Sequence, residues 1–102
     1  MLSAPLLHYV VPGLPFVLDT DASDTAIGGC LGQWYRDEDD VLRDRPVAFA
    51  SKTLSKTRRA YCTTKREMYA VVFFMRYWRS FTEGSMVYIR TDHGSLQYLV
   101  SL

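Results

Sequence analysis

The stretch that decides the fold is PFVLDTDASD, residues 15–24. Its apolar first half predicts a strand, and three aspartates follow at positions 19, 21 and 24. Carboxylates at the end of an apolar strand are costly to bury without a partner, and a divalent metal is one such partner. Asp and Ser also favour turns, so a polar turn after the strand explains the same residues. On this stretch alone both interpretations stay open.

The composition fits one small packed domain. Of the 102 residues, 48% are hydrophobic and 14% are aromatic, which suits a core better than a disordered segment. The formal net charge is +1, so bulk charge predicts neither a nucleic-acid nor a membrane partner. Function must therefore be sought in particular residues.

Positive charge is concentrated in one stretch that contains no acidic residue before Glu67. A local basic stripe can bind a phosphate backbone even in a near-neutral domain. A solvated loop followed by a helix start explains the same charges. The residues are Lys52, Lys56, Arg58, Arg59, Lys65 and Arg66.

Cysteines and apolar runs indicate the compartment. Cys30 and Cys62 lack the spacing of a metal site, so we expect free thiols in a reducing environment. No signal peptide is visible, and no run approaches the roughly 20 apolar residues that span a bilayer. We therefore expect a soluble intracellular protein without a membrane partner.

Hydrophobic patterning predicts an α/β domain with the element order β-β-β-α-β-α. Residues 1–13 are interpreted as a lead-in and residues 14–102 as the domain. A capping box at Thr64–Glu67 predicts a helix start, and Gly84 predicts its stop. The expected strands are 14–21, 25–35, 46–51 and 86–91, the expected helices are 65–81 and 93–102, and 36–45 and 52–64 are expected loops.

Three acidic residues fall at the edges of different expected elements. Asp21 ends the first strand, Glu67 lies in the first turn of the long helix, and Asp92 ends the fourth strand. If the two strands are parallel neighbours, both aspartates emerge at the sheet end where open α/β sheets bind ligands. Glu67 shares a helix face with apolar residues, although the capping box also explains it.

Such a convergence of carboxylates predicts a metal site. Their mutual repulsion is relieved by a cation, and oxygen ligands favour Mg²⁺ or Mn²⁺ over zinc. Two such ions can activate water and stabilise the leaving oxygen in phosphodiester cleavage. The residues therefore indicate metal-dependent phosphodiester chemistry at Asp21, Glu67 and Asp92.

Five segments together resemble the RNase H domain of reverse transcriptases from Gypsy-type LTR retrotransposons. They are FVLDTDASD (16–24), AIGG (26–29), PVAFASKTL (46–54), YCTTKRE (61–67) and RTDHGSL (90–96). The segment SAPL (3–6) is also similar to the one that joins the polymerase part to this domain. The resemblance covers nearly the whole chain in the right order.

The resemblance implies an RNase H-like fold that cleaves the RNA strand of RNA/DNA hybrids, beside a polymerase domain of the same polyprotein. Its three acids fall on Asp21, Glu67 and Asp92. Asp19 and Asp24 take structural or hydrogen-bonding roles, and His93 shapes the start of the last helix rather than acting as a general base. It also implies a cytoplasmic location, virus-like particles included. The family has a fourth acid in a later segment, so the resemblance implies a domain that lacks the final strand and helices.

Two other functions remain open from the sequence. One is a catalytically incomplete RNase H-like module with a binding or structural role beside a polymerase domain. The other takes Asp19-Thr20-Asp21 as a phosphatase-type motif in which Asp19 is the nucleophile. One short motif is weak evidence, and no later lysine motif accompanies it.

Overall fold

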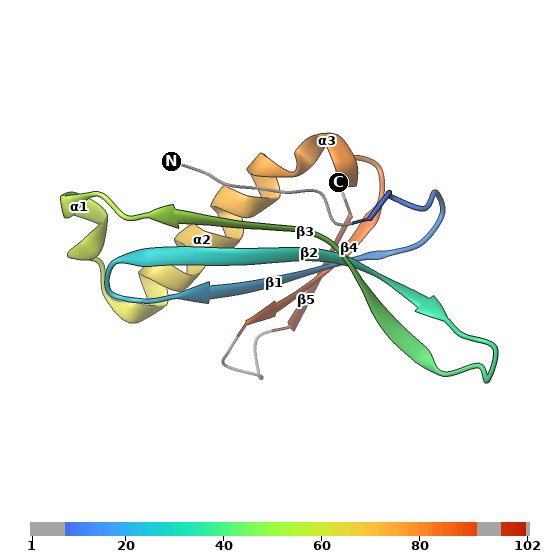
Figure 1. Ribbon diagram of the computed structural model, residues 1–102. Helices are drawn as coiled ribbons and strands as arrows, with labels where there is room; N and C mark the ends of the chain where they lie inside the picture. Colours follow the sequence, from blue (N-terminus) through green and yellow to red (C-terminus); the bar gives the residue numbers. More distant parts are fainter. Residues whose placement is uncertain (1–7, 92–96, 102) are drawn as a thin grey trace.

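The computed structural model describes residues 8–91 and 97–101 of the chain. Five strands and three helices follow one another along it (Figure 1). The strands are β1 (Phe16–Ala22), β2 (Ala26–Arg36), β3 (Leu42–Thr53), β4 (Met86–Thr91) and β5 (Gln97–Ser101). The helices, all between β3 and β4, are α1 (Lys56–Arg59), α2 (Thr63–Tyr77) and α3 (Arg79–Thr82).

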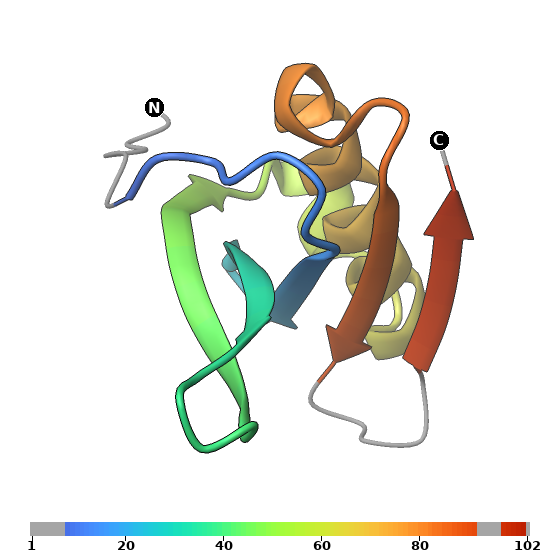
Figure 2. The ribbon, with the colours of Figure 1, turned by 90° about the vertical axis from the view of Figure 1, so that its right-hand side faces the viewer.

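The strands form one mixed sheet in the order β3-β2-β1-β4-β5. β1 and β4 are parallel, and the other neighbouring strands are antiparallel. The helical segment crosses over to join β3 to β4, as parallel pairing of β1 and β4 requires. Figures 1 and 2 show α2 lying obliquely across one face of the sheet. The predicted α/β mixed sheet is confirmed.

The core lies between α2 and this face of the sheet. Along β1, Phe16 and Leu18 point into it, because alternate strand residues share a face. Ala70, Phe74 and Trp78 of the helical segment recur every four residues and are buried against them.

A glycine lets the helix approach the sheet closely. A Cβ atom added at Gly29 of β2 would stand 2.8 Å from the ring of Phe74. Gly29 therefore supplies the space that the largest buried side chain of α2 occupies.

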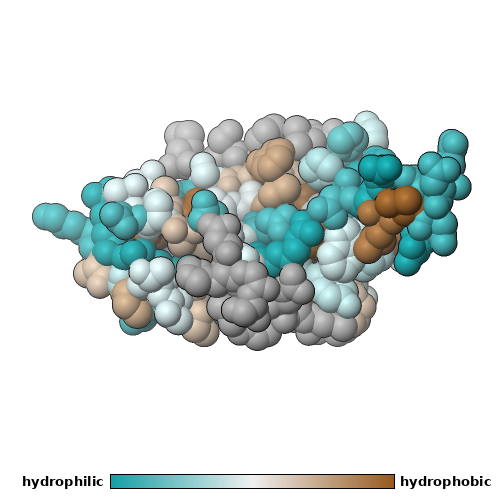
Figure 3. All heavy atoms as spheres, turned by 90° about the horizontal axis from the view of Figure 1, so that it is seen from below, coloured by the Kyte–Doolittle hydropathy of each residue, from teal (hydrophilic) through white to brown (hydrophobic). Residues whose placement is uncertain are grey.

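The strands β2 and β3 extend into the range that was expected to be a loop. The expected loop 36–45 includes the start of β3, because Arg36 pairs with Leu42 and the ladder continues to the turn. Oδ1 of Asp37 accepts hydrogen bonds from the backbone N–H groups of Asp39 and Val41, which closes the turn. Figure 3 shows a hydrophobic patch among hydrophilic side chains at this end; Val41 and Leu42 are the exposed hydrophobic residues there.

Residues 8–13 are attached to the sheet. The buried side chain of Gln33 accepts a hydrogen bond from the Val11 N–H at 2.9 Å and donates one to the Val11 carbonyl oxygen at 2.9 Å. His8 Nδ1 lies 2.6 Å from the carbonyl oxygen of Pro46. Hydrogen bonds to β2 and β3 thus hold residues 8–13 against the sheet.

The predicted long helix is two helices, and its capping box is wrong. α2 begins at Thr63 with Cys62 as its N-cap and no side-chain cap bond, so Thr64 is already inside the helix. Trp78 leaves helical geometry at φ −100° and ψ 18°, which separates α3 from α2 while its indole stays buried. Gly84, at φ +80°, follows the break as the expected stop.

The second helix expected over 93–102 is also wrong where the structure describes it. Residues 97–101 form β5, which pairs antiparallel with β4 from Arg90↔Gln97 to Met86↔Ser101. Tyr98, Leu99 and Val100 favour strands, and their pairing satisfies the backbone groups of the β4 edge. The apolar spacing in the sequence indicated a helix, because a local pattern does not show that the edge of β4 is available for pairing.

Candidate active site

Asp21 lies near the end of β1 on the face of the sheet opposite α2. Phe16 and Leu18 face the core, so alternation places Asp19 and Asp21 on the other face. The Asp21 side chain is exposed to solvent. The parallel pairing of β1 with β4 ends at Thr20↔Thr91, immediately before Asp21 and Asp92 in the sequence. The condition on which the prediction rests, that the first and fourth strands are parallel neighbours, is therefore met.

A hollow of about 480 Å³ opens beside Asp21 on this face. It crosses β1, β2 and β3, the three strands whose residues line it. Its lining is Asp19, Thr20, Asp21, Gly28, Gly29, Cys30, Phe49, Ala50 and Ser51. A predicted site residue thus stands at the edge of a cavity.

Asp19 differs from Asp21 in being paired. Nε of Arg90 lies 2.6 Å from Oδ1 of Asp19, and Nη2 lies 2.8 Å from Oδ2. The same Nη2 donates to Asp44 of β3 at 2.8 Å. This bidentate pairing links β1 to β4, which fits a structural role for Asp19. Among the described residues, Asp21 is therefore the carboxylate of the hollow that has no arginine partner.

Cys30 is the thiol of the hollow and should react slowly. Burial, reinforced by the Asp19 carboxylate, raises the pKa of the Cys30 thiol to about 11. Because the thiolate is the nucleophile, the alkylation rate should rise about tenfold per pH unit up to that value.

At pH 8 we expect iodoacetamide to modify the exposed Cys62 well before Cys30. Peptide mass spectrometry over a time course measures both rates. Equal modification rates of the two cysteines at pH 8 would contradict the raised pKa.

Glu67 lies in α2, one turn ahead of the buried Ala70. It is half-buried and takes part in an interaction with its surroundings. Asp92, His93 and the rest of 92–96 lie outside the described residues. Within the described ranges 8–91 and 97–101, no group of three or more His, Cys, Asp or Glu residues could hold a metal. The three-carboxylate site therefore stays a prediction.

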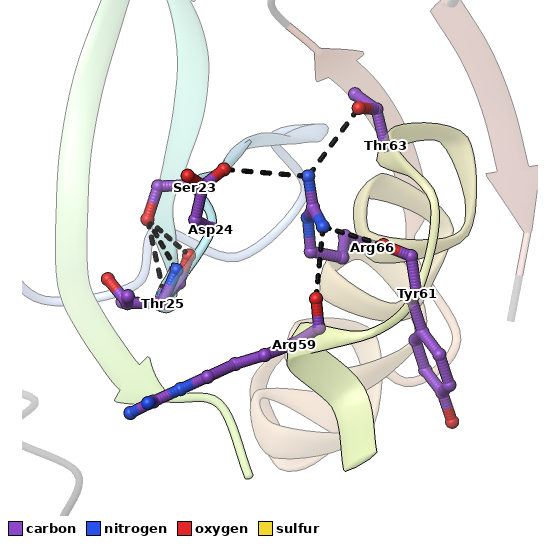
Figure 4. A network of polar contacts seen from close by, with 8 residues as sticks. Ser23, Asp24, Thr25, Arg59, Tyr61, Thr63 and Arg66 are labelled. Atoms are coloured by element: carbon purple, nitrogen blue, oxygen red, sulfur yellow. Dashed lines mark hydrogen bonds and ion pairs between the residues drawn. The ribbon is translucent and has the colours of Figure 1, made fainter. Parts of the chain in front are cut away.

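Arg66 anchors the start of α2 beside the β1–β2 turn (Figure 4). Its Nη1 donates to the carbonyl oxygens of Tyr61 at 2.6 Å and Arg59 at 3.3 Å, and its Nη2 lies 3.7 Å from Asp24. This network brings the first turns of α2, and with them Glu67, to the end of the sheet where β1 finishes. The Asp24 side chain reaches this network while it stays 95% exposed.

The six predicted nucleic-acid contacts divide into three groups. Arg66 and Arg59 bind the chain itself, the latter through Nε to the Leu54 carbonyl oxygen at 3.2 Å. Lys56 lies exposed in α1. The remaining three lie on aromatic rings: Lys52 on Phe73 at 4.6 Å, Arg58 on Tyr69 at 4.6 Å and Lys65 on Tyr61 at 4.2 Å, each measured to the ring centroid.

These three cations form what we call the aromatic–basic face of α2. Neighbouring rings follow one another along the helix, with Phe73 and Tyr77 stacked at an interplanar angle of 11°. A hollow of about 490 Å³ lies on this face, lined by Lys52, Arg58, Tyr69, Val72, Phe73, Arg76 and Tyr77. The rings hold the long cationic side chains in position, which lowers the entropy cost of a further contact.

Comparison with known families decides what this arrangement belongs to. The family described as "RNase H-like domain found in reverse transcriptase" matches residues 11–102. The chain belongs to this family. Among its relatives, the "Retrovirus-related Pol polyprotein from transposon opus" of Drosophila melanogaster is 37% identical over 97 residues, covering 94% of this chain and 9% of the relative.

A second relative comes from a fungus. The "Transposon Tf2-3 polyprotein" of Schizosaccharomyces pombe is 32% identical over 98 residues, covering 94% of this chain and 7% of the relative. The RNase H-like chain thus spans less than a tenth of the length of these curated relatives. It is an RNase H-like domain of the kind found in retrotransposon polyproteins.

Among the predicted ligands, Asp21 is one whose surroundings the structure describes, and its oxygen atoms suit a hard divalent cation. Asp21 offers exposed carboxylate oxygens, and the raised pKa of Cys30 keeps the nearby sulfur protonated and a poor ligand. No helix among the described residues is long and apolar enough to cross a membrane. Sequence reasoning assigned no role to Arg90, because the signal for it is its pairing with Asp19 across two strands.

Proposed function

We propose that this chain is the ribonuclease H module of a Gypsy-type retrotransposon reverse transcriptase, and that it hydrolyses the RNA strand of RNA/DNA hybrids. The observation that carries the proposal is the family match over residues 11–102, with Asp21 exposed at the hollow over β1, β2 and β3. The polymerase domain of the same polyprotein is the proposed partner, and the cytoplasm, with virus-like particles, the proposed location.

Asp21, Glu67 and Asp92 are the proposed ligands of Mg²⁺ or Mn²⁺. When bound, the metal supplies an activated water and neutralises charge on the phosphate. Asp21 would offer its carboxylate oxygens from β1. Glu67 would offer its carboxylate from the first turns of α2, which the hydrogen bonds of Arg66 hold in place. Arg90 keeps Asp19 neutralised, so that repulsion at the site is not increased by a second free carboxylate.

The aromatic–basic face is the proposed contact for the phosphate backbone of the hybrid. Lys52, Arg58 and Lys65 supply the cations, with exposed Lys56 beside them and Arg76 at the lining of the same hollow. Arg59 and Arg66 act indirectly, because their hydrogen bonds position α1 and α2.

The test is cleavage of an RNA/DNA hybrid labelled on the RNA strand. The chain is assayed in the longest polypeptide that its reading frame encodes, with Mg²⁺ and then with EDTA. We expect short RNA products with Mg²⁺, none with EDTA, and no cleavage of duplex DNA. Cleavage that persists in EDTA would contradict the proposal, as would intact RNA with Mg²⁺.

A second candidate is a module that binds a hybrid or packs on a polymerase without cleaving. A hollow of about 430 Å³ between α2 and β4 favours it, because apolar Val71, Val72, Met75 and Ile89 line it beside Arg76, Arg79 and Glu83. An apolar hollow of this kind suits a packed partner. Binding of the hybrid without cleavage in the same assay would select this candidate.

A further inference from the structure

Gly28 occupies a strand interior where nothing in the described chain requires a glycine. Its φ is not positive, and a Cβ atom added there would meet nothing within 4 Å. The register shift of β2 falls between Leu31 and Gly32, so no bulge explains Gly28 either. Glycine weakens a strand, and such a position often marks the close approach of a ligand or of another backbone.

The neighbouring Gly29, in contrast, is required by the packing of the chain itself. Gly29 faces α2, where a Cβ atom would collide with Phe74 at 2.8 Å. Gly28 faces the other way, into the hollow that Asp21 lines. Folding thus accounts for Gly29 and leaves Gly28 to be explained by something outside the described chain.

Strand register places Gly28 in the middle of a row. Asp21 pairs with Gly28, and Gly28 pairs with Ser51, so the three residues cross β1, β2 and β3 on one face. Two strand spacings separate the ends of the row, about 10 Å. Ser51 is exposed, and its hydroxyl makes no hydrogen bond to any residue that the structure describes. The row therefore begins at the Asp21 carboxylate, passes over Gly28, where no side chain covers the strand, and ends at the Ser51 hydroxyl.

We propose that the RNA strand of the hybrid crosses the sheet along the row Asp21–Gly28–Ser51. Gly28 lets the sugar–phosphate backbone lie directly on β2, and the Ser51 hydroxyl donates a hydrogen bond to a sugar or phosphate oxygen. The cleaved bond lies at the Asp21 end. This inference rests on the proposed function and adds the path of the strand and a positioning residue.

Chemistry of the hollow fits a polynucleotide backbone. Arg90 pairs with Asp19, so among the residues that line the hollow Asp21 is the carboxylate without an arginine partner in the described chain, and the cation is proposed there. The half-exposed ring of Phe49 flanks Ser51 and offers an apolar surface to a sugar. A side chain at position 28 would project into the space between these groups.

Gly28→Val is the decisive variant. Because space is open and β-branched residues favour strands, its urea midpoint should equal or exceed that of wild type. We expect hybrid binding, followed by fluorescence anisotropy in EDTA at low salt, to weaken at least tenfold. With Mg²⁺, KM should rise by a similar factor, with a smaller change in kcat.

Two graded variants and two controls accompany it. Gly28→Ala should weaken binding less than valine does, and Ser51→Ala should weaken it about fivefold, as loss of one hydrogen bond predicts. Thr53→Val places valine on the same face of β3 outside the hollow, and Ser80→Ala removes an exposed hydroxyl of α3. Both controls should bind as wild type.

Wild-type binding and KM in both Gly28→Val and Ser51→Ala would overturn the strand path while the proposed function stands. A lower urea midpoint in Gly28→Val than in wild type would also overturn it, because the glycine would then be needed for the stability of the fold. If the wild-type chain neither binds nor cleaves the hybrid, the proposed function itself fails and this inference fails with it.

Discussion

Asp21→Asn is expected to lower the rate of hybrid cleavage by about 100-fold or more. The substitution keeps the size of the side chain but removes the charge that attracts a divalent cation. Metal catalysis supplies several kcal/mol of transition-state stabilisation, and each 1.36 kcal/mol is a factor of ten in rate. Initial rates on an RNA-labelled hybrid, over a Mg²⁺ series, measure the effect.

The same variant should remain folded. Asp21 is exposed, and surface substitutions of this kind change the free energy of unfolding by about 0.5 kcal/mol or less. Asp24→Asn is the matched control, because it makes the same chemical change three residues later. The Asp24 side chain is 95% exposed and lies 3.7 Å from Arg66. Equal cleavage by the Asp21 and Asp24 variants would remove Asp21 from the site.

Local patterning predicted the fold well where packing and propensity agree. The expected strand 86–91 is β4 to the residue, and the apolar run of residues 15–18 enters β1 as expected. Trp78 was placed inside a helix because its spacing is helical, yet tertiary packing breaks the helix there. The strand at residues 97–101 depends on an open edge of β4, and a local pattern holds no information about edges.

The site was predictable as far as it depends on order along the chain. Asp21 and Glu67 could be named as candidates because each stands near the boundary of an element. Arg90 was not, because its pairing with Asp19 spans 71 positions and follows from the parallel register of β1 and β4. The basic stripe shows the same limit, since counting charges could not show that Arg66 is bound to carbonyl oxygens of its own chain.

Phe74→Ala is expected to lower the free energy of unfolding by about 3–5 kcal/mol. Phe74 is fully buried, stacks on Trp78 at 5.3 Å between centroids and covers Gly29. Deleting the ring removes its transfer free energy and leaves a cavity between α2 and the sheet. Urea unfolding, followed by circular dichroism, measures the change. Val72→Ala, at a helix position 46% exposed, should change it by less than about 0.5 kcal/mol.

The cavity can be located by a second substitution at Gly29. In the wild-type background, Gly29→Ala forces a methyl group against a ring that cannot move freely, which should cost about 1–3 kcal/mol. In the Phe74→Ala background the ring is gone, so the same methyl group enters the cavity and its cost should fall to near zero or reverse. The difference between the two backgrounds is a coupling free energy of residues in contact. Additive effects of Gly29→Ala and Phe74→Ala would mean that the two residues do not touch, and the packing of α2 on β2 would then be wrong.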